Sequence, residues 1–364
     1  MAYFQDGFTE FSYFNICKKI TYNFYNERMD DKNLNLFYSD DEELNACACV
    51  DKNNNDYLII NAGTFVDVFA LMKTAFSQKD LFYEIGDSSI ETNNIILGEY
   101  DEELKQVSYT GKPKDEYRDF ISNYCCFNFV LKFIALHEMG HIVDGHTRLL
   151  NKLYAKPEIY MRLEKAINNK MYCLDRRTLE MDADAVAISA VFDHVATTYK
   201  DCIGKEPLDR LKSPEDIFKL WSFSIAILFM YFEVKAPSEY DPNGYYLPNN
   251  ARFKLAMLAA KENAKLFIKH GIVKELEPNK NKIISAIING IDEASRLIER
   301  IFNIKLDWLS TFEDEEFDFY SNEVLNNWDN RLKKKLEKYA RVTLYNPETV
   351  EADFIKAMSE KEKP

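Results

Sequence analysis

Apolar residues recur every three or four positions along most of this chain, a spacing that places them on one face of a helix. The predicted helices cover residues 8–16, 64–76 and 119–141, two segments within 156–200, residues 213–234, and the chain from 251 to a charged tail. Thr64 is predicted to cap the second of these helices, and Asp144-Gly145 is a natural helix stop. The pattern therefore predicts a predominantly helical protein.

Residues typical of strands are confined to the N-terminal third of the chain. Two short β-prone runs, Asn45–Val50 and Asp56–Gly63, flank the polar turn Asp51–Asn55, which predicts a β-hairpin. A further short strand is predicted at Asn94–Leu97, within a loop-rich stretch over residues 78–118. Together the patterns predict an α+β, predominantly helical fold with a small N-terminal β-sheet and a helical C-terminal region.

The length of 364 residues is enough for two or three regions of average domain size. The patterns divide the chain into three regions. We expect an N-terminal α+β region over residues 1–118 that carries the hairpin. A helical core is expected over residues 119–250, followed by a helical C-terminal region over residues 251–364.

One segment raises the question of a membrane. Residues Leu220–Phe232 form a run of 13 residues without a charge, between Lys219 and Glu233. A helix that spans a bilayer needs about 20 apolar residues, so this length is typical of a buried core helix. The alternative is a membrane-associated hairpin.

Composition limits the kinds of binding partner and indicates the cellular compartment. There are 46 Lys and Arg against 60 Asp and Glu, and the resulting net charge of −14 argues against nucleic acid and anionic membranes as partners. The seven cysteines include no C-x-x-C pair, which is typical of reduced thiols rather than a disulfide framework or a zinc ribbon. The N-terminus shows no basic stretch followed by an apolar one, so we expect a cytoplasmic protein.

Three of the five histidines lie within ten residues: His137, His141 and His146. His137 and His141 are four residues apart on a predicted helix, so their imidazoles project from one face, one turn apart. That separation lets both bind one Zn²⁺ ion. Glu138 lies about 100° round the helix and can reach a water at the metal without being a ligand. The arrangement is the H-E-x-x-H motif of zinc peptidases.

A catalytic zinc site needs a third protein ligand. Metzincins place a glycine seven positions and a histidine ten positions after the first motif histidine. Those positions hold Asp144 and Thr147 here, so this class is excluded. His146 misses the required spacing by one residue and follows a predicted helix stop, so we interpret it as a polar loop residue.

Better candidates for the third ligand lie downstream, within residues 178–187. Glu180 and Asp184 are four residues apart on a second predicted helix. One carboxylate can bind the metal while the other accepts the free N–H of a ligand histidine. Asp182, two positions from Glu180, is expected to point away from that face. Alanines at every second position from 183 to 187 allow close packing on the first helix. The alternative, a solvated acidic face, is disfavoured by the apolar residues around these acids.

HEMGH followed by E-M-D-A-D-A resembles the gluzincin pattern of HtpX-like peptidases, in which H-E-x-x-H is followed by E-x-x-x-D. The resemblance implies a zincin-like (minigluzincin) core. It also implies Glu180 as the third zinc ligand and Asp184 as the carboxylate behind a ligand histidine. Soluble Lit-like phage-exclusion peptidases are more similar, because this chain lacks the long membrane-spanning segments of HtpX. These cytoplasmic bacterial enzymes have an NA-x-A…IIN hairpin upstream of the motif, and NACACV…DYLIINAG is similar to it.

Mechanism follows from these parts. Glu138 is the expected general base, taking a proton from water and passing it to the leaving amine. The developing oxyanion needs a further donor, and we single out Tyr245 and Arg252. HtpX-like peptidases have a Pro…Arg element in a comparable place; the alternative for Arg252 is a surface arginine that pairs with one of many acids. His194 and His270 are further donors that nothing in the sequence distinguishes.

The sequence thus predicts a soluble zinc endopeptidase that acts on a cytosolic protein substrate. The Lit-like resemblance implies a specific host protein, such as a translation factor, cleaved in phage defence, and an activating protein or peptide is a further expected partner. The strand Asp56–Asn61 offers either an edge that pairs an extended peptide or an ordinary interior strand. The alternative function is a binding or regulatory module with structural zinc, which would not need Glu138. An aminopeptidase is disfavoured because no acidic motif for an N-terminal amine is evident.

Overall fold

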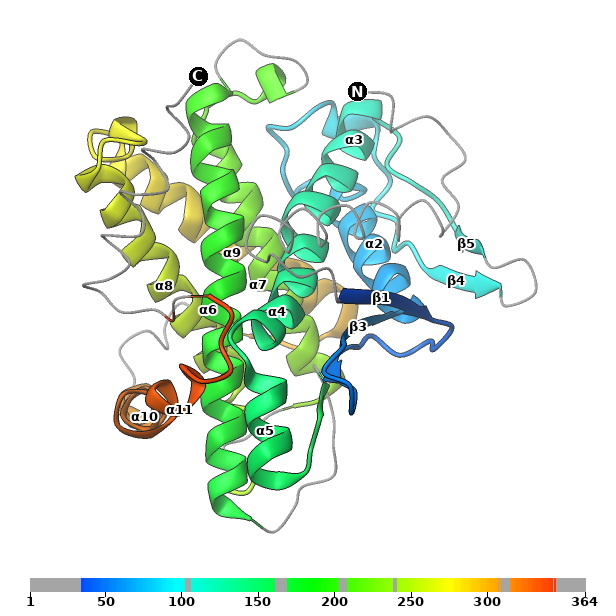
Figure 1. Cartoon of the computed structure of the whole chain (residues 1–364). Coiled ribbons are helices and arrows are strands. Elements are labelled where there is room, and N and C mark those ends of the chain that lie inside the picture. The colour runs from blue at the N-terminus through cyan, green and yellow to red at the C-terminus, as the bar shows by residue number, and fades with distance from the viewer. Residues whose placement is uncertain are drawn as a thin grey trace, which may run out of the picture.

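The computed structural model describes residues 34–101, 106–160, 169–202, 208–237, 241–306, 308, 315–342 and 344. These residues form a mostly helical α+β fold with a four-stranded mixed sheet and a separate two-stranded sheet (Figure 1). The predicted fold class is confirmed at this level. The helix predicted over residues 8–16 lies outside the described residues.

The larger sheet has the strand order β1-β3-β2-β6. Its members are β1 (Leu34–Ser39), β2 (Ala46–Val50), β3 (Asp56–Asn61) and β6 (Glu158–Tyr160). β1 runs parallel to β3, and the other two pairings are antiparallel. The hairpin predicted for β2 and β3 is confirmed. Since β3 lies between β1 and β2, the second of the two alternatives, an ordinary interior strand, is the correct one.

The first helix of the described chain, α2 (Ala62–Phe76), begins directly after β3. Asn61 occupies the N-cap position, so the prediction that Thr64 caps this helix is wrong. The Thr64 hydroxyl instead donates to Asn45 O over 2.7 Å and accepts from Asn45 N over 3.0 Å. It therefore ties the start of the helix to the start of β2, which explains why a hydroxyl residue is needed at that position.

The loop-rich stretch before the motif contains a second hairpin. Its strands are β4 (Gly98–Asp101) and β5 (Gln106–Tyr109). The strand predicted at residues 94–97 is therefore displaced: β4 begins at Gly98, where that prediction ended.

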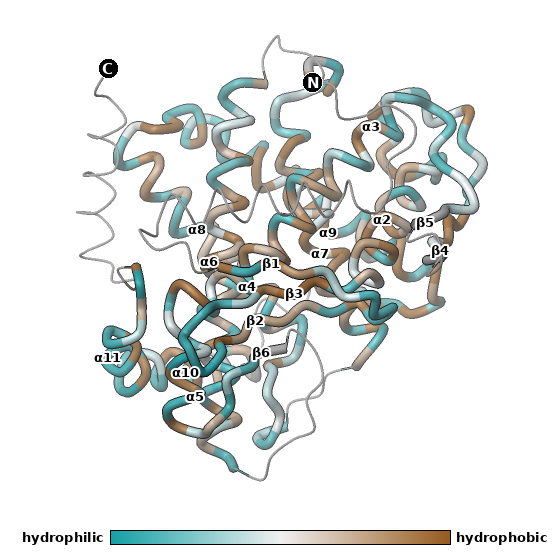
Figure 2. The backbone as a smooth tube through the Cα atoms, turned by 45° about the vertical axis from the view of Figure 1, so that its right-hand side comes forward, coloured by the Kyte–Doolittle hydropathy of each residue, from teal (hydrophilic) through white to brown (hydrophobic). Residues whose placement is uncertain are grey.

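The histidine motif lies on a long helical rod. This rod consists of α3 (Glu116–Cys125), a π-helical turn (Cys126–Leu131) and α4 (Lys132–Val143). It ends at Asp144-Gly145, as predicted. Gly145 has a φ of +79°, and a Cβ there would lie 2.4 Å from the backbone of Tyr339, so glycine is required on both counts. α4 packs against β2 and β3 of the sheet (Figure 2).

The second candidate helix is longer than the sequence pattern indicated. After α5 (His146–Tyr154) and β6, a single helix α6 runs from Lys170 to Asp201, where two helices were predicted within residues 156–200. α6 crosses the middle of the molecule and packs against α4 and α8 (Figure 1). Many of the buried residues in its first half are charged or polar, from Asp175 to Asp184, so no continuous apolar face marks its extent in the sequence.

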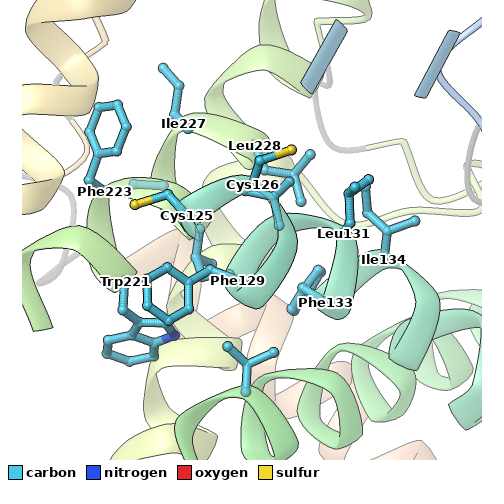
Figure 3. Close-up of a cluster of buried hydrophobic side chains, with 14 of the residues drawn as sticks. Cys125, Cys126, Phe129, Leu131, Phe133, Ile134, Trp221, Phe223, Ile227 and Leu228 are labelled. Carbon is cyan, nitrogen blue, oxygen red and sulfur yellow. The ribbon is translucent and has the colours of Figure 1, made fainter. Parts of the chain in front are cut away.

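The uncharged run lies on α7 (Asp216–Lys235), and every residue from Leu220 to Phe232 is buried, as predicted. Figure 3 shows Trp221 and Leu228 of this helix in one apolar cluster with Cys125, Cys126 and Phe129 of the helical rod. Six cysteines within the described ranges are free thiols, in keeping with the predicted absence of a disulfide framework.

The remaining helices lie in the C-terminal region, as predicted. They are α8 (Asn249–Lys269), α9 (Lys280–Phe302), α10 (Glu315–Asn327) and α11 (Lys333–Leu336). α9 packs on α7 and α10 packs on α6, so this region is joined directly to the helices before it. By length and composition, two helical segments of the described chain could cross a membrane, Glu116–Val143 and Asp216–Lys235, and most of each is buried inside the fold.

Replacing Leu228 with Asp should destabilise the protein by more than about 3 kcal/mol, because an unpaired carboxylate would lie in an apolar interior. Leu228 is 1% exposed. The matched control is Leu258→Asp on α8, where the side chain is 42% exposed and the expected change is below about 0.5 kcal/mol. Denaturant unfolding measures both free energies. Equal effects at the two positions would contradict the buried placement of α7.

Candidate metal centre

Helices α4 and α6 meet through small residues. A Cβ on Gly140 would lie 3.3 Å from Ala183 Cα and 3.4 Å from Val186 Cβ, which is tighter than most real contacts, so the helices lie close enough here to favour a glycine. The residues at this contact are spaced i, i+3 and i+4 on both helices: His137, Gly140 and His141 on α4, and Glu180, Ala183 and Asp184 on α6. The predicted donors thus flank the point of closest approach.

The three predicted metal ligands lie together. His137 Nε2 is 3.3 Å from Glu180 Oε2, His141 Nε2 is 3.5 Å from Glu180 Oε1, and the two Nε2 atoms are 3.3 Å apart. One donor atom from each residue falls within 4.8 Å of the other two, and all three side chains are buried. Two imidazole nitrogens and a carboxylate oxygen are donors that zinc accepts, and three protein donors leave a fourth position open.

Asp184 lies behind His137, as the resemblance implied. Its Oδ1 is 2.9 Å from His137 Nδ1, on the side of the ring opposite the ligand nitrogen. Arg252 of α8 donates two hydrogen bonds to the same carboxylate, from Nε over 2.8 Å and from an Nη over 2.9 Å. Arg252 is 4% exposed, so the alternative of a surface arginine is wrong. Its guanidinium fixes Asp184, and Asp184 in turn orients His137.

Glu138 has a different environment from the other acids. It is fully buried, and neither carboxylate oxygen has a hydrogen-bond partner among the residues that the structure describes. Burial raises its pKa to about 8, and the neighbouring charge of Glu180 adds to this, against the opposing effect of His137. Glu138 is thus a carboxyl group that can gain and lose a proton near neutral pH and has open lone pairs for a water or substrate.

The charges of the centre favour a cation. Three buried carboxylates, on Glu138, Glu180 and Asp184, face only two guanidinium groups, those of Arg176 and Arg252. Burial alone would lower the pKa of His137, but Asp184 and Glu180 outweigh it and raise that pKa to about 10. Protons on His137 and Glu138 therefore offset the carboxylate charge. A divalent cation can take the place of those protons, so the donor set and the local charge both fit a metal ion.

Arg176 was not identified from the sequence, and Tyr246 was passed over in favour of its neighbour Tyr245. Arg176 lies one turn before Glu180 on α6 and donates to Glu180 Oε1 over 3.1 Å. Tyr246 has its hydroxyl 3.4 Å from the same Arg176 Nη atom, and its ring centroid lies 5.5 Å from Arg252 Cζ. The i−4 spacing from Glu180 was a usable signal for Arg176. Tyr246 has no such signal, because it comes from a loop.

The other predicted donors have different neighbours. Tyr245 packs its ring against Tyr172, with centroids 5.4 Å apart, and its ring centroid lies 5.6 Å from Arg176 Cζ. His194 has its Nε2 3.3 Å from the hydroxyl of Tyr124, and His270 lies at the C-terminal end of α8. Arg252 contacts Asp184 directly, and the hydroxyl of Tyr246 lies 3.4 Å from Arg176.

His146 belongs to the centre, so its interpretation as a polar loop residue is wrong. It is the first residue of α5 and is fully buried. Its Nδ1 lies 2.9 Å from His141 Nδ1, and its Nε2 lies 3.1 Å from Asp182 Oδ2. Burial lowers the pKa of His146 to about 4, so this imidazole is neutral at pH 7. Asp182 points away from Glu180, as expected, but it reaches His141 through His146.

Comparison of the chain with protein-family models, with curated proteins and with solved structures finds no match. Residues and geometry alone therefore support the proposals that follow.

Purified protein should contain about one equivalent of zinc, and His141→Ala and Glu180→Ala should each lose tight binding, because each removes one of three protein donors. Metal analysis after dialysis measures the stoichiometry. His194→Ala is the control, since His194 lies on α6 but contacts Tyr124. Full metal content in either ligand variant would contradict the ligand assignment.

Asp184→Asn should weaken zinc binding about 10–100-fold, because the carboxylate that orients His137 is lost. Competition with a chromophoric chelator measures the affinity. The control is Asp193→Asn, the same change at an exposed position of α6. Asp182 is unsuitable as a control because of its contact with His146. Equal affinities for Asp184→Asn and the wild type would refute the role of Asp184.

Proposed function

We propose that this protein is a zinc-dependent endopeptidase with a gluzincin-type centre on a zincin-like core. The observation that carries the proposal is Glu138. A buried carboxylate without a hydrogen-bond partner costs stability, and a site that only stored a metal would gain nothing from it. Its place one residue after the ligand His137 is where a general base for metal-assisted hydrolysis is needed.

His137, His141 and Glu180 would hold the metal. When bound, zinc supplies Lewis-acid chemistry, polarising the scissile carbonyl and lowering the pKa of a water molecule. Glu138 takes one proton from that water as its oxygen bonds to the carbonyl carbon. The same carboxyl group then gives the proton to the amide nitrogen as the C–N bond breaks, so protons balance over one turnover. Burial raises the pKa of Glu138 and so favours the protonated form that delivers the proton to the leaving amine.

Tyr246 is the donor that we assign to the developing oxyanion. Burial and the nearby charge of Glu180 raise the pKa of its hydroxyl, so it stays protonated and can donate. Arg176 contacts both this hydroxyl and Glu180, and thereby couples the donor to the ligand. Arg252 is engaged with Asp184 and acts in positioning rather than on the substrate.

The substrate must gain access to a centre that is covered. His137, Glu138, His141 and Glu180 are each at most 1% exposed. A peptide can reach them only after some covering segment moves. An activating protein or peptide that displaces this cover fits the Lit-like resemblance, with a specific cytosolic protein as substrate and phage defence as the setting.

The alternative, a binding module with structural zinc, is less well supported. Structural zinc sites are closed by four protein ligands, whereas this centre offers three together with an unpaired carboxylate.

Glu138→Gln should keep zinc and fold but abolish proteolysis, because it removes the base while preserving shape and the three ligands. New protein N-termini would be mapped in lysates of uninfected and phage-infected bacteria after incubation with wild type or variant. Glu262→Gln, at an exposed position of α8, is the control and should cleave as the wild type does. Undiminished cleavage by Glu138→Gln would show that another residue is the general base. If the wild-type protein binds zinc but produces no new N-termini in either lysate, the binding module is favoured instead.

A further inference from the structure

The histidine after the motif makes a contact that the proposed chemistry does not explain. His146 stands between His141 and Asp182, with Nδ1 2.9 Å from His141 and Nε2 3.1 Å from the aspartate. All three side chains are buried. They come from three elements, α4, α5 and α6. The left-handed turn at Gly145 lets α5 begin immediately after α4 and return its first side chain to His141.

If His141 binds the metal, the protons on His141, His146 and Asp182 can be placed in one consistent way. Its Nε2 faces His137 Nε2 and Glu180 Oε1, so a ligand role requires a free lone pair there. The proton of the neutral imidazole must then be on Nδ1, where it is donated to His146 Nδ1. His146 accepts at Nδ1, carries its own proton on Nε2 and donates it to the carboxylate of Asp182.

The opposite arrangement is incompatible with ligation by His141. If His146 donated from Nδ1, His141 would accept at Nδ1 and carry its proton on Nε2, which is the atom that faces the other donors. The unprotonated Nε2 of His146 would then face Asp182 Oδ2, which could satisfy it only by carrying a proton itself. An ionised Asp182 therefore selects the tautomer of His146, and His146 selects the tautomer of His141.

We propose that His146 and Asp182 are positioning residues that hold His141 in the Nδ1–H tautomer through a row of two hydrogen bonds, and so present its Nε2 to the metal. This inference rests on the proposed function. The two ligand histidines are then oriented differently. Asp184 contacts His137 directly, whereas Asp182 acts on His141 through the imidazole of His146. Removing the intermediate imidazole should free the His141 ring to rotate and to change tautomer.

A second metal ion is the competing interpretation, because Asp144, His146 and Asp182 also bring donor atoms within 4.8 Å of one another. The hydrogen-bonded row is favoured because both nitrogens of His146 already have partners at hydrogen-bond distance, from His141 and Asp182. A second ion would require His146 Nε2 to release Asp182 as its hydrogen-bond partner.

The test compares His146→Leu, which removes the acceptor, with His146→Asn, whose amide oxygen can still accept from His141 Nδ1–H. Zinc affinity should fall about 10–100-fold in His146→Leu and be largely restored in His146→Asn. The visible spectrum of the Co²⁺-substituted protein should change in the leucine variant only. His194→Leu, which removes a histidine of α6 outside the centre, should change neither. The unfolding temperature of the metal-free proteins shows whether each variant folds.

Nitrogen NMR of the imidazoles gives a direct readout that needs no activity. With only five histidines in the chain, His141 can be assigned, and it should be protonated at Nδ1 in wild type with and without zinc. Wild-type affinity in a folded His146→Leu, or a His141 protonated at Nε2 in the zinc-loaded protein, would overturn the proposed row. Two metal ions in wild type and one in His146→Leu would establish the second metal site instead. A wild type that binds no metal would refute the proposed function itself, and the positioning role with it.

Discussion

The close approach of α4 and α6 is the constraint on which the centre depends. Gly140 and Ala183 occupy the contact, where a Cβ on Gly140 would lie 3.3 Å from Ala183 Cα and would require a neighbour to shift by a few tenths of an ångström. The ligand histidines lie on either side of Gly140, and Glu180 and Asp184 lie on either side of Ala183. Because imidazole and carboxylate groups reach only a few ångströms from the helix surface, a small change in helix separation would draw the donors away from one another.

Many charged side chains are buried where α4 and α6 meet, and most of them pair with a group of opposite charge. Arg252 pairs with Asp184, Arg176 pairs with Glu180, and His137 lies against both acids. Glu138 is the exception, since its carboxylate has no hydrogen-bond partner within the described part of the chain. Burying an unpaired carboxyl group lowers stability, so its retention is more readily explained by chemistry than by folding. Asp184 and Glu180 raise the pKa of His137, and burial is the main cause that raises the pKa of Glu138. A divalent cation can replace the protons that these two groups hold.

Predictions from the sequence were correct where all the residues of a pattern lie on one helix or one hairpin. The motif at His137–His141 and the pair Glu180 and Asp184 each have a spacing that is meaningful on a single helix, and α4 and α6 place them together. The hairpin of β2 and β3 and the buried α7 run were predicted on the same basis. Predictions that depended on neighbouring elements were less successful. α6 is one helix where two were predicted, because buried charged residues in its first half interrupt the apolar periodicity. β3 gains a parallel partner from an earlier segment.

What the sequence determined by itself is the set of donors and their spacing within each helix, since helical periodicity alone decides which side chains share a face. Only the tertiary structure decided which residues support those donors. His146 follows a helix stop and looked like a loop residue, yet the turn at Gly145 returns it to His141. The rings of both adjacent tyrosines lie against Arg176, and the Tyr246 hydroxyl is 3.4 Å from that guanidinium, while Tyr245 also packs on Tyr172. Arg252 became part of the centre because α8 packs against α6. These contacts join segments far apart in the chain or separated by a sharp turn, and no local periodicity encodes them.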